Sequence, residues 1–277
     1  MKKKSLLDLI KMKETGEKIS WITAYDAPFA SFAEAAGIEM ILVGDSLGMV
    51  VLGYESTIPV TMDDCIRHCQ AVRRGAPNTF VVGDMPFGSY QTCPEDAVFN
   101  AVRFLKEGGV DAIKLEGGKR VAPQIRAICE AGIVVCGHIG LTPQSSGVLG
   151  GHKAQGRTIE SARAVIEDAL AVQEAGAFSV VLECIPAPVS ALITSKLDIP
   201  TIGIGGGTEC DGQILVYQDM LGTFTDYVPK FVKHFANIGE EMVNAFKAYD
   251  EEVKAKTFPD DEHSFQMKNE EALKRLY

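Results

Sequence analysis

The sequence lacks a regular pattern of cysteines. Its 7 cysteines are odd in number, lie scattered along the chain and include no Cys-x-x-Cys pair, so no disulfide framework is indicated. Cys65 and Cys69, with His68 between them, are compatible with a metal cluster, but they lie on an amphipathic helical stretch and we interpret them as packing residues. Unpaired cysteines are typical of a reducing compartment, so we expect a cytoplasmic protein.

Long apolar runs and blocks of basic residues are also missing. The basic start of the chain resembles a signal peptide, but Asp8 and Lys11 interrupt the apolar stretch that follows, so we do not expect secretion. No window of about 18 consecutive apolar residues occurs, and we expect no membrane-spanning helix. The net charge is −10, from 27 Lys and Arg against 37 Asp and Glu. This balance argues against nucleic acid as a partner, because such binding depends on neutralising phosphates.

A repeated unit organises the 277 residues. Four times, an amphipathic stretch ends in an acidic residue and a glycine, and a short apolar run then leads to a polar side chain. Glycine at a helix end supplies the left-handed cap conformation, and apolar runs without polar alternation are typical of parallel strands covered on both faces. The four runs span residues 40–45, 112–116, 133–138 and 179–183.

Further apolar runs raise the expected number of strands to eight: residues 21–25, 80–83, 201–204 and 214–217. Strands that alternate with helices form parallel sheets with right-handed crossovers. No Gly-x-Gly-x-x-Gly sequence opens a helix after the first strand, so we predict a (β/α)8 TIM barrel rather than an open doubly wound sheet. We expect residues 1–277 to form one domain, with a C-terminal extension from about residue 257.

Polar side chains follow the expected strands, at the barrel face that carries active sites. They are Asp26, Asp45, Ser46, Asp84, Lys114, Glu116, His138 and Glu183. Carboxylates that converge on one rim repel each other unless a cation or bound protons intervene. Hard oxygen donors with one histidine and no cysteine pair suit Mg2+ better than zinc. The sequence therefore predicts a magnesium-dependent barrel enzyme that acts on a small oxygen-rich anion.

Some of these residues also have a purely structural interpretation. Asp26 stands between a strand and a helix, and we favour a role as helix N-cap. Lys114 and Glu116 lie two residues apart on one strand, so both can face the barrel mouth, or they can form an internal salt bridge. His138 is either a site residue or a core histidine with satisfied hydrogen bonds.

Two loops are candidates for ligand contact. Residues 141–157 form a long connection of small residues after the fifth strand, which is typical of an active-site lid, with disorder as the alternative. Gly203, Gly205, Gly206 and Gly207 follow the seventh strand, where barrels often bind phosphate. A tight bend that lines the mouth fits these glycines equally well.

At these residues the sequence closely resembles the ketopantoate hydroxymethyltransferase family. The resemblance runs in order from about residue 5 to about residue 265, nearly the whole chain. It is carried by residues 22–26, 43–48, 56–61, 71–77, 84–87, 114–118, 137–145, 182–184 and 211–215.

The resemblance implies a barrel of the phosphoenolpyruvate/pyruvate type. The implied reaction is hydroxymethyl transfer from 5,10-methylenetetrahydrofolate to 3-methyl-2-oxobutanoate through a Mg-stabilised enolate, giving ketopantoate for pantothenate and coenzyme A. Carried onto matching positions, it implies Asp45, Asp84 and Glu116 as the Mg2+ group, directly or through water, and Glu183 as the catalytic base. We expect the 2-oxo acid to contact Asp45, Ser46, Asp84, Lys114 and His138. A homodecamer is implied as well.

Two other functions remain open at this point. The first is another magnesium-dependent lyase or mutase on the same barrel, acting on a 2-oxo acid or phosphoenolpyruvate. A requirement for methylenetetrahydrofolate would distinguish the two enzymes. The second is a catalytically silent barrel that serves in binding or assembly, against which the cluster of costly acidic residues argues.

Overall fold

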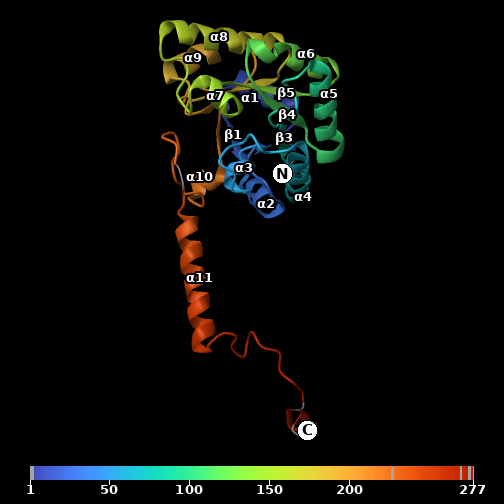
Figure 1. Cartoon of the computed structure of the whole chain (residues 1–277), viewed down its shortest axis with the longest axis vertical. Helices are drawn as coiled ribbons and strands as arrows, with labels where there is room; N and C mark the ends of the chain where they lie inside the picture. Colours follow the sequence, from blue (N-terminus) through green and yellow to red (C-terminus); the bar gives the residue numbers. More distant parts are fainter. Residues whose placement is uncertain (1–2, 226–227, 269, 274–275, 277) are drawn as a thin grey trace.

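The chain folds into a closed barrel of eight parallel strands that follow one another in sequence order (Figure 1). The computed structural model describes residues 3–225, 228–268, 270–273 and 276. The predicted TIM barrel is confirmed. Its strands are β1 (Ile19–Thr23), β2 (Met40–Val43), β3 (Phe80–Asp84), β4 (Ala112–Glu116), β5 (Val135–Gly140), β6 (Ser179–Glu183), β7 (Thr201–Ile204) and β8 (Gly212–Leu215).

Helices between the strands form the outer layer of the barrel, and further helices precede the first strand or follow the last one. They are α1 (Leu6–Thr15), α2 (Ala27–Ala36), α3 (Leu47–Val50), α4 (Met62–Gly75), α5 (Pro94–Arg103), the π-helical η1 (Phe104–Gly108), the 3-10 helix η2 (Lys119–Val121), α6 (Ala122–Glu130), the 3-10 helix η3 (Pro143–Ser145), α7 (Ser146–Leu149), α8 (Ile159–Glu174), α9 (Ala187–Lys196), α10 (Tyr217–Leu221), α11 (Ile238–Ala255) and α12 (Glu270–Leu273). None of the helices in these described residues is both long and apolar enough to cross a membrane.

Three strands begin at positions other than those predicted. β1 and β8 each begin two residues earlier and β5 two residues later than expected. In β8 the reason is Gly212, which pairs with Ile19 where the barrel closes. A Cβ at Gly212 would lie 2.5 Å from the Ile19 carbonyl oxygen, so only glycine permits this approach. A glycine within a strand marks such a close contact between backbones, and sequence patterns commonly assign it to a turn instead.

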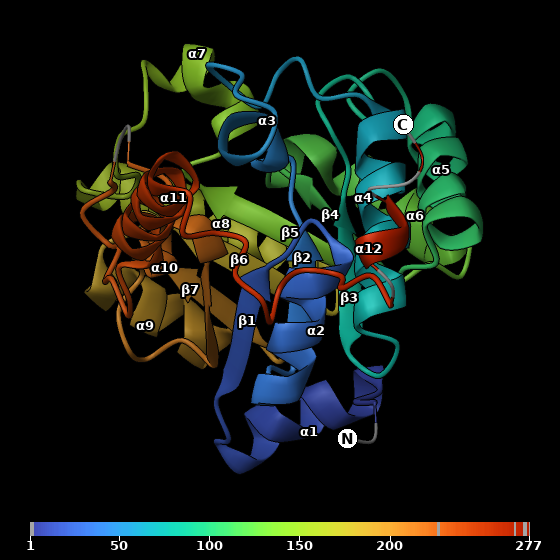
Figure 2. The ribbon, with the colours of Figure 1, turned by 90° about the horizontal axis from the view of Figure 1, so that it is seen from below.

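Helix α1 covers the amino-terminal end of the barrel. Ser5 caps this helix and Asp8 completes a capping box, which satisfies two of the amide groups left free at a helix start. Leu9 and Met12 are fully or almost fully buried, and they pack with the apolar side chains inside the barrel, including Trp21. Figure 2 shows α1 at one end of the barrel and α3 and α7 at the other. The carboxyl ends of the strands therefore form the open end.

The cysteines on α4 belong to the core between the strands and the outer helices. Cys65 and Cys69 are fully buried and pack in the same cluster as Val43 and Phe104. His68 points away from them, with Nδ1 2.5 Å from the Tyr25 carbonyl oxygen. The packing role that we predicted for the two cysteines is confirmed.

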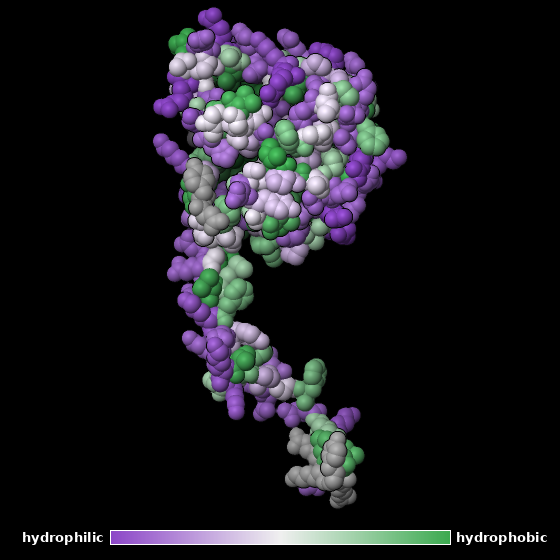
Figure 3. Space-filling view, viewed as in Figure 1, coloured by the Kyte–Doolittle hydropathy of each residue, from purple (hydrophilic) through white to green (hydrophobic). Residues whose placement is uncertain are grey.

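The last long helix, α11, extends away from the barrel (Figure 1). None of its residues is buried. Apolar and aromatic side chains nevertheless recur at helical spacing along it, and Figure 3 shows green patches on the projecting part of the molecule. These side chains are Met242, Val243, Phe246, Tyr249 and Val253. Of the expected C-terminal extension, residues 269, 274, 275 and 277 lie outside the described residues.

Candidate active site

Asp45 and Asp84 meet at the carboxyl ends of two adjacent strands. Asp84 is the last residue of β3 and Asp45 follows β2 by two residues. The backbone N–H of Asp45 donates to Asp84 Oδ2 over 3.1 Å, and both side chains are buried. Burial first, and then the charges of Asp84 and Glu116, raise the pKa of Asp45 well above its usual value. The two acids therefore share a site in which negative charge is not fully compensated.

Lys114 supplies positive charge from the next strand. Its Nζ lies 2.8 Å from Asp84 Oδ1, and both side chains are at most 4% exposed. Burial alone would lower the pKa of Lys114, but the charges of Asp84, Glu116 and Asp45 outweigh it, so the pKa is raised. Lys114 therefore remains an ammonium ion in the interior. The structure pairs it with Asp84, not with Glu116 as in the salt bridge that the sequence left open.

His138 on β5 lies between two glutamates. Its Nε2 is 3.1 Å from Glu183 Oε2, and its Nδ1 is 3.4 Å from Glu116 Oε1. Burial and Lys114 lower the pKa of His138, but the hydrogen bonds to Glu116 and Glu183 prevail and raise it to about 9. In return, the hydrogen bond and charge of His138 lower the pKa of Glu116 against the opposing effect of burial. His138 thus lies within 3.4 Å of Glu116, Glu183 and Lys114, so it belongs to the charged site and is not an isolated core histidine.

The charge balance of this cluster favours a divalent cation. Four carboxylates, those of Asp45, Asp84, Glu116 and Glu183, face the two cationic groups of Lys114 and His138, which leaves an excess of two negative charges when all are ionised. No three His, Cys, Asp or Glu side chains among the described residues converge as a ready-made ligand set. The donors are nevertheless all hard oxygens, and their uncompensated charge matches Mg2+, so the residues present fit this ion.

Asp45, Asp84, Lys114, Glu116, His138 and Glu183 form a charged network at the strand ends. Two buried residues that the sequence did not indicate are hydrogen-bonded to it. Gln144, in η3, donates from Nε2 to Asp45 Oδ2 over 2.9 Å, and its backbone N–H donates to Glu116 Oε2 over 3.1 Å. The Tyr90 hydroxyl donates to Gln144 Oε1 over 2.7 Å and accepts from the backbone N–H of Glu116. In the sequence, the one feature that could have indicated Gln144 is its polar side chain, close to the start of a loop composed mostly of small residues.

The remaining candidate residues lie at the edge of this network or outside it. The Ser46 hydroxyl is 2.8 Å from that of Tyr25, beside Asp45 in sequence. Asp26 is the N-cap of α2, with Oδ1 accepting from Phe29 N over 2.9 Å, as we favoured. The glycines after β7 form a bend that packs closely against α9. A Cβ at Gly207 would lie 2.5 Å from that of Ala187, so this position requires glycine.

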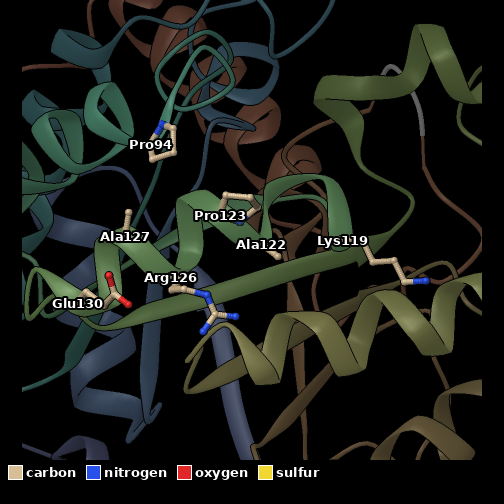
Figure 4. A pocket seen from close by; sticks show the side chains of 7 residues that line it. All are labelled: Pro94, Lys119, Ala122, Pro123, Arg126, Ala127 and Glu130. Carbon is tan, nitrogen blue, oxygen red and sulfur yellow. The ribbon is translucent and has the colours of Figure 1, made fainter.

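A cavity of about 480 Å3 lies away from these residues, on the outside of the barrel. Figure 4 shows its lining, which comes mainly from α6 and its entry. The lining side chains are Pro94, Lys119, Ala122, Pro123, Arg126, Ala127 and Glu130. None of them belongs to the charged network at the strand ends, so we do not assign the chemistry to this cavity.

Solved structures with the same fold come from a superfamily of barrel enzymes. Phosphonopyruvate hydrolase, in complex with oxalate and Mg2+, superposes with a TM-score of 0.60 at 12% identity, covering 99% of this chain and 98% of its own. 2,3-Dimethylmalate lyase, a member of the PEP mutase/isocitrate lyase superfamily, gives a TM-score of 0.58 at 17% identity, covering 98% and 93%. At these identities the similarity shows the fold alone.

Sequence similarity is far more specific. The 3-methyl-2-oxobutanoate hydroxymethyltransferase of Alkaliphilus metalliredigens is 64% identical over 277 residues, which is 100% of this chain and 98% of that protein. The protein of the same name from Carboxydothermus hydrogenoformans is 53% identical over 100% of both chains. A family model described as ketopantoate hydroxymethyltransferase matches residues 3–261. The chain therefore belongs to the ketopantoate hydroxymethyltransferase family.

Proposed function

We propose that this enzyme transfers a hydroxymethyl group from 5,10-methylenetetrahydrofolate to 3-methyl-2-oxobutanoate, giving ketopantoate for pantothenate and coenzyme A synthesis. The observation that carries the proposal is the buried charged network at the open end of the barrel, in which Lys114 and His138 lie among four carboxylates. Because the carboxylates outnumber the cationic groups, such a site attracts a small anionic acid only together with a metal cation. One of its carboxylates, that of Glu183, is then available to remove a proton from the substrate.

Asp45, Asp84 and Glu116 are the proposed Mg2+ group, and Asp45, Ser46, Asp84, Lys114 and His138 the proposed contacts of the 2-oxo acid. When bound, Mg2+ polarises the 2-oxo group and makes the neighbouring C3–H more acidic. The buried ammonium of Lys114 stabilises the negative charge that develops on the 2-oxo oxygen. It does so strongly because the surroundings are dry and its position is fixed by Asp84.

Glu183 is the proposed base. It ends β6, and its side chain is more open to solvent than those of Asp84 and Glu116, so it is accessible from the barrel mouth. The C3–H bond breaks, its proton passes to Glu183, and its electron pair forms the enolate. C3 then bonds to the methylene carbon as the bond from that carbon to one folate nitrogen breaks. Water bonds to the same carbon as its bond to the second folate nitrogen breaks, and the proton on Glu183 and one proton of the water pass to the two nitrogens. His138 holds Oε2 of Glu183 and fixes the direction of the carboxylate.

Proton exchange tests the assignment of the base. In D2O, the wild-type enzyme with Mg2+ should exchange the C3 proton of 3-methyl-2-oxobutanoate for deuterium, as followed by proton NMR. Glu183→Gln should reduce the rate by about 10²- to 10⁴-fold, the usual contribution of a general base. Glu174→Gln, at the exposed end of α8, is the matched control and should exchange normally. Exchange retained by Glu183→Gln would assign the base elsewhere, with His138 as the first candidate.

A lyase or mutase acting on a 2-oxo acid or phosphoenolpyruvate is the less supported alternative, because its similarity to this chain extends only to the fold. The two activities are separated by a turnover assay. Formation of ketopantoate should require both 3-methyl-2-oxobutanoate and 5,10-methylenetetrahydrofolate, and turnover of the acid without the folate would contradict the proposal.

The same proposal includes a cytoplasmic homo-oligomer, with the homodecamer implied by the family resemblance. An isolated helix of 18 residues such as α11 is marginally stable in water without a packing partner. Phe246 and Tyr249 are 65% and 60% exposed on it, and the chain's own barrel does not cover them (Figure 1). A second copy of this chain is the proposed partner. The 7 cysteines, free in the structure, agree with a reducing compartment.

A further inference from the structure

Gln144 connects the loop of residues 141–157 to Asp45 and Glu116 by hydrogen bonds of its side chain and backbone. It belongs to η3, at the start of the loop of residues 141–157, and is 5% exposed. Its side chain donates to Asp45 Oδ2 and, over 3.0 Å, to the Met85 carbonyl oxygen. Its Oε1 accepts from the Tyr90 hydroxyl and, over 3.1 Å, from Gln91 Nε2. All donors and acceptors of the amide are therefore engaged.

The orientation of this amide is determined by backbone groups at both ends. The Met85 carbonyl can only accept, so the NH2 group of Gln144 has to face it and Asp45. On the other side, Gln91 Oε1 accepts from the backbone N–H of Gly88 over 2.7 Å, so Nε2 of Gln91 has to donate to Gln144. An amide fixed in this way presents a donor to Asp45 and cannot reverse without losing hydrogen bonds on both sides.

The hydrogen bond from Gln144 Nε2 determines the orientation of the Asp45 carboxylate. It engages Oδ2, so the carboxylate is held in one rotational orientation and Gln144 leaves Oδ1 free for other partners. Groups that hydrogen-bond to ligating carboxylates commonly change metal affinity 10- to 100-fold when they are removed. The backbone N–H of the same residue fixes Oε2 of Glu116. One residue thus orients two of the three acids in the proposed Mg2+ group.

Both ends of the loop are attached to the site. Helix α7 begins two residues after Gln144, and residues 147–148 and 150–154 are partly or fully exposed. At the far end, the backbone N–H of Gln155 donates to the carbonyl of Cys184 over 3.0 Å, next to Glu183. The loop therefore starts at the proposed metal acids and returns beside the proposed base.

We propose that Gln144 is a positioning residue, which orients Asp45 and Glu116 for Mg2+ and couples the conformation of the 146–154 loop to occupancy of that site. The inference rests on the proposed function, because it needs Mg2+ to bind between these acids.

Calorimetric titration with Mg2+, in the presence of 3-methyl-2-oxobutanoate, tests the first half. Gln144→Met keeps the volume but removes the donor, and should weaken Mg2+ binding by about 10- to 100-fold. Gln144→Leu removes the donor and also shortens the side chain, and should weaken it at least as much. Gln155→Met makes the same change at the other end of the loop, where the side-chain amide donates to the Lys153 carbonyl, and should remain within about twofold of wild type.

Amide hydrogen exchange followed by mass spectrometry tests the second half. In the wild type, Mg2+ with the 2-oxo acid should slow exchange across residues 146–154. In Gln144→Met the same addition, at saturating Mg2+, should leave exchange in that segment unchanged. Tyr90→Phe removes the hydroxyl that donates to the Gln144 amide and accepts from the backbone N–H of Glu116. It should shift both readouts in the same direction by less, which keeps the test available if the Gln144 variants fail to fold.

The outcomes separate the inference from the function on which it rests. Wild-type Mg2+ affinity in a folded Gln144→Met protein would overturn the positioning role and leave the proposed function intact. A wild-type protein that binds no Mg2+ with the 2-oxo acid would overturn both. Loss of affinity in Gln144→Leu with full retention in Gln144→Met would show that the residue acts by shape, which also contradicts the proposal.

Discussion

The ion pair between Lys114 and Asp84 offers a quantitative test of the charge arrangement. Lys114→Met replaces the ammonium by an apolar group of similar length and leaves Asp84 buried without its partner. In a protein stripped of divalent cations with EDTA, the carboxylate then has to take up a proton to remain in the interior. Burial already raises the pKa of Asp84 above its usual value of 3.8, and Lys114 is the first group that opposes this rise.

The loss of folding stability in Lys114→Met can be estimated from the free energy needed to protonate Asp84. An unfolded aspartate with a pKa of 3.8 binds a proton at pH 7 at a free-energy cost of about 4 kcal/mol, and at pH 5 at a cost of about 2 kcal/mol. The expected loss of folding free energy at pH 7 agrees with the destabilisation of about 3–5 kcal/mol found when a buried ion pair loses one partner. A raised folded-state pKa favours stability in acid, and this contribution disappears as the pH rises. Lys114→Met should therefore be most destabilised at neutral pH.

Calorimetric unfolding at pH 5 and pH 7 in EDTA measures this difference. We expect the melting temperature at pH 7 to fall by about 10 °C, and by about half as much at pH 5. Lys119→Met removes an exposed pair with Glu167 and is the control, with an expected loss below about 1 kcal/mol at either pH. An equal loss at both pH values, or one no larger than that of the control, would refute the argument that Lys114 compensates a buried charge.

Two further predictions concern regions outside the charged network. Burial raises the pKa of Asp219 on α10 to about 6, so this carboxyl favours the folded state in acid and loses that effect as the pH passes 6. Asp219→Asn should raise the free energy of unfolding at pH 7 by about 1–3 kcal/mol and leave it unchanged near pH 4 in urea titrations; equal shifts at both would contradict this. Phe246→Glu on α11 should reduce the mass measured by analytical ultracentrifugation, and an unchanged large mass, or a single-chain mass in the wild type, would contradict the role of α11 in assembly.

The strand order and most strand positions could be predicted from the sequence because parallel barrel strands are buried on both faces. The apolar runs at residues 80–83 and 179–183 coincide with β3 and β6 to within one residue. The errors fall where a strand begins in residues that are not typical of strands. Gly212 is read as a turn, although the approach of the Ile19 backbone is what requires it. No local pattern contains that contact, because the two residues are far apart in the chain.

The candidate site could be predicted to a similar extent. Residues at strand ends have to meet at one face of a barrel, so Asp45, Asp84, Lys114 and Glu116 could be grouped without coordinates. Their partners could not be assigned. That Lys114 pairs with Asp84, and that His138 links two glutamates, depends on the stagger of neighbouring strands. Gln144 lies in a loop, whose path is determined by tertiary contacts rather than by hydrophobic periodicity.

The helix that covers the amino-terminal end of the barrel has a consequence for the order of events in turnover. Leu9 and Met12 fill that end, so ligands enter and leave through one opening. In the proposed reaction, the smaller substrate has to reach the acids of the proposed Mg2+ group, which are almost inaccessible to solvent and lie below the rim. A bulky folate seated at the rim would then stand in the path of the smaller molecule in both directions. The architecture therefore favours a compulsory sequence, in which the oxo acid is first to arrive and its hydroxymethylated product last to depart.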